Sequence, residues 1–170
     1  MPNAMIRGAK NEDGYKFDSL KEKLDSGLIS PNGVVREDLI TEVERFAAAL
    51  RKAGVTQSSI RKIYDSFKTL QLRIQQEFMA LISSGECGNN FEQAAQQAFL
   101  KIRPLMLLLK NKSKYVIERK KKDTKKDEGA VKAYDDFQAF ISTCAEKTHS
   151  SKEFNAFMDL FECIIANLKE

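Results

Sequence analysis

The sequence is poor in residues that interrupt regular structure: its 170 residues include eight glycines, three prolines and no tryptophan. So few glycines and prolines leave little room for the many tight turns of an all-β fold. The longest apolar runs, such as residues 105–109, span five residues, far too few to cross a bilayer. The N-terminus also lacks the apolar core of a signal peptide. We therefore expect a cytoplasmic protein without a membrane partner.

Residues suited to catalysis or metal binding are equally scarce. The one histidine, His149, precedes an expected helix start, where a surface residue explains it better than half of a Cys–His nucleophile. Cys144 and Cys163 are expected on buried helix faces, whereas Cys87 lies in a loop where an inert and a reactive thiol are both open. No HExxH, CxxC or glycine-rich phosphate loop is present. The sequence predicts no catalytic site, no metal site and no cofactor, and hence a protein that is not an enzyme.

What the sequence does contain is strong helix formers, with apolar residues recurring at three- and four-residue steps. These patterns predict helices over about residues 36–53 and 58–83, then from about 91, 131 and 151 onward. We expect an all-α fold, a single-domain bundle of five to six helices over residues 35–170. The polar, glycine-containing residues 1–34 are expected to be a loosely ordered N-terminal segment.

Local features mark the expected helix ends. Asn89 or Asn90, and later Ser150 with Glu153, have the spacing of a capping box. Pro104 removes a backbone donor, so it either kinks its helix or begins a new one. The lysine-rich residues 120–128 are expected to be a loop or a frayed helix end. The aromatic stripe of the last helix predicts core or subunit interface rather than a platform for stacking bases.

Positive charge is concentrated in one segment. Residues 101–126 contain eleven lysines and arginines and two acidic residues, a net charge of +9, so the rest of the chain carries −5. Such segregation is typical of a surface that meets a polyanion, most simply nucleic acid, although a solvated lysine-rich loop would look the same. If residues 105–121 are helical, two neighbouring basic stripes result. One stripe holds Lys112, Tyr115 and Arg119, and the other holds Arg103, Lys110, Lys114 and Lys121. Tyr115 either stacks on a base or, the more common role, is a core or hydrogen-bonded tyrosine.

Three segments together resemble a known family, the small α-helical subunit of type III-A CRISPR (Csm) RNA-guided effector complexes. Residues 55–64 (VTQSSIRKIY) are similar to its threonine-x-serine-x-leucine/isoleucine-arginine helix opening. Residues 109–119 (LKNKSKYVIER) are similar to its second motif, lysine-x-lysine with a tyrosine three residues on and a glycine-arginine end. Residues 154–169 (FNAFMDLFECIIANLK) resemble its closing helix. Order and spacing agree over roughly residues 50–169, with two departures: Glu118 replaces the usual glycine, and Asn167 stands where an aromatic often follows the alanine.

The resemblance implies a non-catalytic subunit that is present in several copies and stacks along the complex as a filament. Its partners would be guide RNA, target RNA and the other subunits of the effector complex. Recognition would be of RNA backbone and shape, because base pairing already reads the sequence. The matched motif positions implied to bind RNA are Arg61, Lys110, Lys112 and Arg119, and helix geometry adds Lys62, Lys68 and Lys114.

Two other classes of function compete with an RNA-binding subunit. One is a helical protein–protein interaction scaffold with no nucleic-acid contact, whose basic face meets acidic partners. The other is a hydrolase, which would need a cleft of convergent polar groups that the sequence does not indicate.

Overall fold

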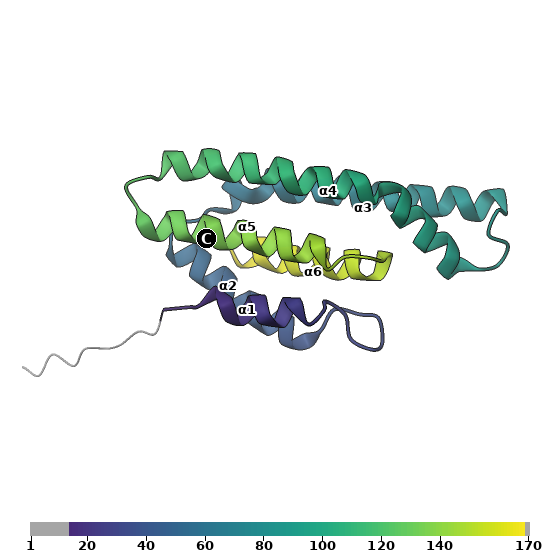
Figure 1. Ribbon diagram of the computed structural model, residues 1–170, viewed down its shortest axis with the longest axis horizontal. Helices are drawn as coiled ribbons and strands as arrows, with labels where there is room; N and C mark the ends of the chain where they lie inside the picture. Colours follow the sequence, from purple (N-terminus) through teal and green to yellow (C-terminus); the bar gives the residue numbers. More distant parts are fainter. Residues whose placement is uncertain (1–13, 169–170) are drawn as a thin grey trace, which may run out of the picture.

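The computed structural model describes residues 14–168, and this part of the chain folds into an elongated bundle of six α-helices (Figure 1). The helices are α1 (Phe17–Asp25), α2 (Glu37–Lys52), α3 (Gln57–Ser84), α4 (Phe91–Asp123), α5 (Glu128–Glu146) and α6 (Ser151–Asn167). Helices α3 and α4 form a long antiparallel hairpin along one side of the molecule. The prediction of an all-α bundle of five to six helices is confirmed.

The expected caps begin and end the helices. The Asn90 side chain accepts a hydrogen bond from the backbone N–H of Gln93, 3.0 Å away, at the start of α4. Ser150 accepts from the N–H of Glu153 at 3.2 Å, as the predicted capping box requires, while the Glu153 carboxylate accepts from the N–H of His149, one residue before the cap. Gly85 ends α3 with a φ of 72°, a left-handed conformation that glycine adopts without strain.

The core is built around α6. Its phenylalanines are fully buried and pack mostly edge-to-face or tilted against aromatic rings of α3 and α5. Phe161 alone lies 5.3 Å, between ring centroids, from Tyr64 and 5.7 Å from Phe137. The aromatic stripe of the last helix is therefore core, one of the two roles predicted for it.

The described part of the predicted loose N-terminal segment, residues 14–34, is instead part of the bundle. Phe17, Leu20, Leu24 and Leu28 of α1 and the following turn are buried against α2 and α5. The prediction was wrong here because three apolar positions in a helix of nine residues give a weak pattern. Residues 1–13, which the same prediction covered, lie outside the described residues.

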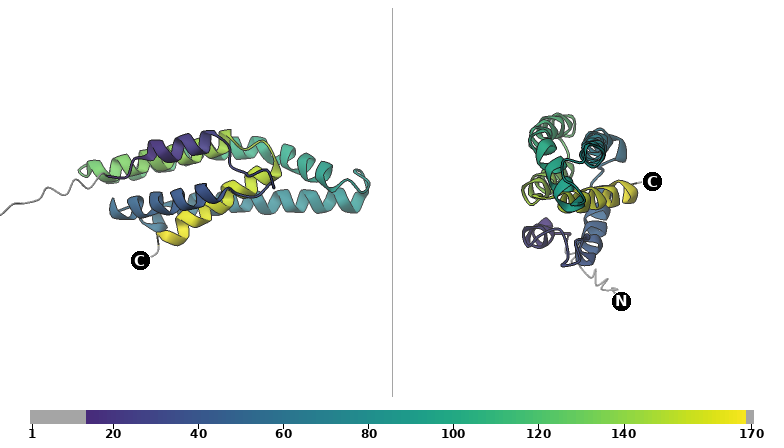
Figure 2. Two further views of the ribbon diagram at one scale, coloured as in Figure 1. Left: turned by 90° about the horizontal axis from the view of Figure 1, so that it is seen from below. Right: turned by 90° about the vertical axis from the view of Figure 1, so that its right-hand side faces the viewer.

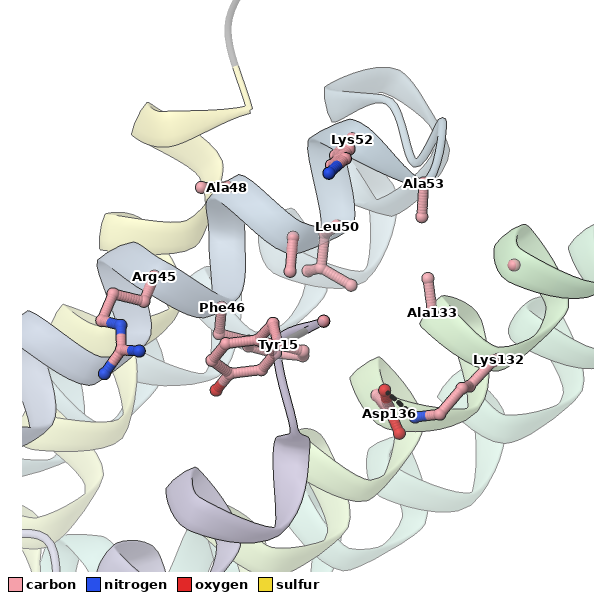
Figure 3. A pocket seen from close by; sticks show the side chains of 13 residues that line it. Tyr15, Arg45, Phe46, Ala48, Leu50, Lys52, Ala53, Lys132, Ala133 and Asp136 are labelled. Carbon is pink, nitrogen blue, oxygen red and sulfur yellow. Dashed lines mark hydrogen bonds and ion pairs between the residues drawn. The ribbon is translucent and has the colours of Figure 1, made fainter. Parts of the chain in front are cut away.

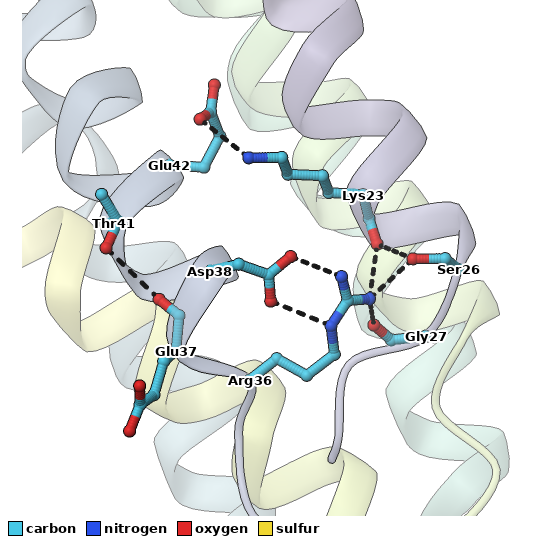
Figure 4. A network of polar contacts seen from close by, with 8 residues as sticks. All are labelled: Lys23, Ser26, Gly27, Arg36, Glu37, Asp38, Thr41 and Glu42. Carbon is cyan, nitrogen blue, oxygen red and sulfur yellow. Dashed lines mark hydrogen bonds and ion pairs between the residues drawn. The ribbon is translucent and has the colours of Figure 1, made fainter.

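One arginine fastens α1 to α2 (Figure 4). Arg36 donates from Nη1 to the carbonyl oxygens of Lys23 and Gly27, at 3.0 and 2.7 Å, and its Nε and Nη2 hold the Asp38 carboxylate. The hydrogen bond from Arg36 holds the pKa of Asp38 below its usual range. The Arg36 guanidinium thus supplies donors to carbonyls at and just beyond the end of α1, where the Lys23 carbonyl also accepts from Ser26 Oγ at 2.7 Å.

Helix α4 runs unbroken through Pro104, so this residue does not begin a new helix, and Figure 1 shows that α4 is bent along its length. Proline has no N–H to donate to the carbonyl of Leu100, and its ring crowds that carbonyl. The helix continues into the lysine-rich run as far as Asp123, and only residues 124–127 form the connection to α5. Of the two structures expected for residues 120–128, a helix end is the closer description.

Candidate nucleic-acid interface

The α3–α4 hairpin carries all seven residues predicted to bind RNA, so its register decides which of them meet. Lys101 on α4 makes an ion pair with Glu77 on α3, with 2.7 Å between Nζ and Oε2. Arg61 precedes Glu77 by sixteen residues, and Ile117 follows Lys101 by sixteen. Because both helices rise by about 1.5 Å per residue, the first turns of α3 lie level with the last turns of α4, within about one turn. The two basic stretches are therefore side by side.

The predicted residues of α3 fall on two different sides of that helix. Its α6 side is marked by Tyr64, which packs on Phe161, and by Gln71, which donates to Asn155 at 2.9 Å. At about 100° per residue, Arg61 and Lys68 lie within about 60° of Tyr64, whereas Lys62 lies about 160° away. Arg61 and Lys68 thus flank the α6 interface, and Lys62 is exposed on the other side of α3.

Carboxylates of α6 face the first of these sides. The pKa of Asp159 on α6 is raised by burial and by the neighbouring Glu162. The positive charge of Lys68 opposes this shift without cancelling it. The pKa of the Tyr64 phenol is likewise raised by burial and by neighbouring carboxylates, and the positive charge of Arg61 lowers it in part. Arg61 and Lys68 therefore have acidic side chains close by, and the surface around them is not purely basic.

The predicted residues of α4 are divided in the same way. Lys110 lies 3.8 Å from the carboxylate of Glu146 on α5, and Lys121 lies 2.6 Å from that of Asp135. Lys114 is about 40° from Lys110 around the helix, so it borders the α5 side, although it is exposed. The second predicted stripe therefore faces α5, and its positive charge is partly neutralised there.

Glu118, the departure from the family motif, belongs to this same side. Its carboxylate lies 3.1 Å from Lys121, which Asp135 also holds, and these two hydrogen bonds raise the pKa of Lys121. Because Lys121 draws Glu118 toward α5, its negative charge is directed away from the first predicted stripe.

The first predicted stripe, by contrast, is exposed to solvent along its length. Lys112, Tyr115 and Arg119 are exposed, and Lys112 lies about 20° around the helix from Lys101, which pairs with α3. Their side chains therefore border the outer groove between α4 and α3. On the α3 side of that groove stand Lys62 and Arg73, eleven residues apart and both exposed. We call these five residues the hairpin groove: Lys62, Arg73, Lys112, Tyr115 and Arg119.

The hairpin groove has unopposed positive charge. Among residues 14–168, none of its four cationic side chains has an ion-pair partner. Tyr115 is 68% exposed, so a core position, one of the roles left open for it, is excluded and its ring is accessible for stacking. Arg73 was missed by the sequence reasoning, although counting three helical turns onward from Lys62 would have found it.

In the part of the chain that the structure describes, groups that could perform chemistry are not brought together. Within residues 14–168, no cluster of three or more histidine, cysteine or acidic side chains could hold a metal ion. Burial raises the pKa of the Cys144 and Cys163 thiols, which disfavours the reactive thiolate. His149 is exposed, with its Nδ1 3.5 Å from the guanidinium of Arg103. None of the helices in the described part is long and apolar enough to span a membrane.

Comparison with protein families adds an independent observation on the same helices. The family model described as Csm2 Type III-A matches residues 34–169, which include the whole α3–α4 hairpin. The chain belongs to the Csm2 type III-A family. No curated protein and no solved structure matches it in a direct comparison. Csm2 membership makes the chain a small subunit of a type III-A CRISPR complex, associated with the other subunits of that complex.

Proposed function

We propose that this Csm2-family chain is a non-catalytic subunit that binds the backbone of guide and target RNA through its hairpin groove. It does so in the cytoplasm, in several copies that stack along the effector complex as a filament. The observation that carries the proposal is the hairpin groove itself, where four cationic side chains without ion-pair partners among residues 14–168 lie along the same side of the hairpin as an exposed tyrosine. Arginine forks and lysine point charges suit phosphate oxygens, and an aromatic ring suits a splayed base.

The seven sequence-predicted residues have unequal parts in this proposal. Lys62, Lys112 and Arg119 lie in the hairpin groove and contact phosphates directly, together with Arg73. Lys114 is exposed at the edge of α4 and adds to the field. Arg61, Lys68 and Lys110 border α6 or α5, where nearby carboxylates reduce what they contribute.

The test is fluorescence anisotropy of a short labelled RNA across a salt series. The groove variant is Lys62→Glu/Lys112→Glu/Arg119→Glu. The matched control makes the same change of charge on the other sides, Arg61→Glu/Lys68→Glu/Lys114→Glu. Each lost phosphate contact lowers the slope of log affinity against log salt by about 0.7, so the groove variant should lose about 2. Circular dichroism and thermal melts confirm that both variants fold.

Equal losses in the two variants would mean that only net charge matters and that the groove is not the site. The second candidate function, a protein-binding scaffold, is favoured by apolar side chains left open on the hairpin, such as Leu72, Leu100 and Leu108, each at least half exposed. A wild-type chain that binds no RNA even at low salt would favour that function.

A further inference from the structure

Glu118 lies on α4 at the border between the hairpin groove and the side of the helix that packs on α5. At about 100° per residue, it is about 60° around the helix from Tyr115 and about 60°, in the other direction, from Lys121. Seen along the bundle in the right-hand view of Figure 2, α4 has α3 as one neighbour and α5 as another. The Glu118 side chain is 49% exposed, so it has room to turn to either side. A carboxylate turned to the groove would repel a phosphate bound there.

Lys121 holds the Glu118 carboxylate on the α5 side. Its Nζ lies 3.1 Å from Oε1 of Glu118 and 2.6 Å from Oδ1 of Asp135, a residue of α5. Because Asp135 belongs to the neighbouring helix, it anchors the ammonium group away from the groove. The Lys121 side chain is 20% exposed and lies about 120° around α4 from Tyr115, so it does not itself face the groove.

Other cations on α4 would compete for Glu118 if Lys121 lost its charge. Lys114 and Lys122 lie four residues before and four residues after Glu118, and both are exposed. A glutamate four residues N-terminal to a lysine makes the more favourable of these two pairs, so Glu118 would turn to Lys122. Lys122 lies about 20° around the helix from Tyr115, which is the groove side. The released carboxylate would therefore stand at the edge of the RNA site.

We infer that Lys121 is a positioning residue for the RNA site, because it binds no RNA itself but keeps the Glu118 carboxylate out of the hairpin groove. This inference rests on the proposed function and adds a residue that acts on RNA binding without touching the RNA. The effect of Lys121 passes through Glu118, so it disappears when position 118 carries no charge.

The test is a double-variant cycle, measured as anisotropy of a short labelled RNA at low salt. The chains are the wild type, Lys121→Gln, Glu118→Gln and the two changes together. Lys121→Gln alone should weaken RNA binding at least about fivefold, because the released carboxylate lies well within a Debye length of the bound phosphates. When Glu118→Gln is also present, the same change should cost less than about twofold. Lys121→Arg keeps the charge and can pair with both carboxylates, so it should bind like the wild type.

A matched control removes a lysine of another ion pair. Lys132 lies 2.9 Å from Asp136, and both residues line a cavity between α2 and α5 (Figure 3). Lys132→Gln should change RNA affinity by less than about twofold, with or without Glu118→Gln. The loss caused by Lys121→Gln should shrink as salt is raised, since the repulsion is screened, whereas a loss of folding would not. Thermal melts would confirm that all chains fold.

Two results would overturn the inference. Equal losses from Lys121→Gln with and without Glu118→Gln would mean that Lys121 contacts RNA or acts through net charge alone. No loss from Lys121→Gln would mean that Glu118 does not turn to the groove. These results are distinct from failure of the RNA site, which the charge-reversed groove variant reports. If that variant loses RNA binding while the cycle shows no coupling, only the role of Lys121 is wrong.

Discussion

The base and the tip of the α3–α4 hairpin have the same antiparallel geometry but present opposite surfaces. At the base, Lys62, Lys112 and Arg119 lie around an exposed tyrosine, and the body of the bundle supports the hairpin on α5 and α6. At the tip, the charged residues of the segment 74–100 are three glutamates, of which Glu77 pairs with Lys101 and Glu92 with Lys152, and Phe91 is largely exposed. The comparison teaches that one long helical pair can present an excess of positive charge at one end and none at the other, so that only the base suits the polyanion proposed to bind there.

The largest loss of stability should come from truncating a buried side chain on which the base of the hairpin packs. Phe161→Ala deletes a fully buried ring that packs against Tyr64 and Phe67 of α3, and we expect a loss of about 3–5 kcal/mol of unfolding free energy. Phe91→Ala at the tip should cost less than about 0.5 kcal/mol, because that ring is largely exposed. Urea denaturation of the two variants measures both values. Equal losses would mean that the tip is as tightly packed as the base.

The next effect should separate the packing of α1 from that of the hairpin. Arg36→Ala removes the hydrogen bonds that fasten α1 to the start of α2. We expect a loss of about 2 kcal/mol and faster hydrogen exchange in α1, with the helices of the groove unaffected. Lys21→Ala, which breaks an exposed pair with Asp25, serves as the control and should change stability by less than about 0.5 kcal/mol. Faster exchange in α3 and α4 as well would contradict this separation.

A smaller effect, on RNA affinity, should show whether the exposed ring in the hairpin groove stacks on a base. Tyr115→Ala removes an exposed ring, and the loss of one stacking contact should weaken RNA binding by about 1 kcal/mol, roughly fivefold. Tyr115→Phe keeps the ring and should bind like the wild type. Anisotropy at several salt concentrations should show the same salt slope for all three chains, since no charge changes. A changed slope would mean that Tyr115 acts on phosphate contacts.

The smallest effect should be on how strongly the melting temperature falls at acid pH. Because Arg36 holds the pKa of Asp38 below its usual range, the pair stabilises the fold above the unfolded pKa, near ~3.9. This contribution is lost as the pH falls through the lower, folded pKa. Thermal melts at pH 7 and at about pH 3 should therefore show a smaller acid-induced drop in melting temperature for Asp38→Asn than for the wild type. Equal drops would mean that the clamp adds nothing to stability.

Much of the helical architecture follows from the sequence, because long helices bury regular stripes. The pattern from Ile60 to Ile74 predicted α3 to within one residue at each end, and the Ser150 capping box placed the start of α6. Helix α1 escaped prediction because its contacts are distant in sequence and its fastening depends on Arg36, eleven residues beyond its end. Such long-range polar contacts leave no periodic pattern.

The candidate site was predicted as a set of residues but not as a surface. Spacing on one helix grouped Lys112, Tyr115 and Arg119 correctly, since their relative angles are properties of the helix alone. Spacing could not show that Lys110 faces Glu146 or that Arg61 borders α6, because these depend on how helices pack. Nor could it bring Arg73 into the groove, which requires the register between α3 and α4.

Photocrosslinking from the two ends of the hairpin tests the contrast between them most directly. The photoreactive residue p-benzoylphenylalanine would replace Tyr115 in one chain and Phe91 in another, both exposed aromatic positions. Each chain would be irradiated with labelled RNA and excess wild-type protein. We expect position 115 to crosslink to RNA and position 91 not to. RNA crosslinked at position 91, or none at position 115, would contradict the placement of the RNA-binding surface at the base of the hairpin.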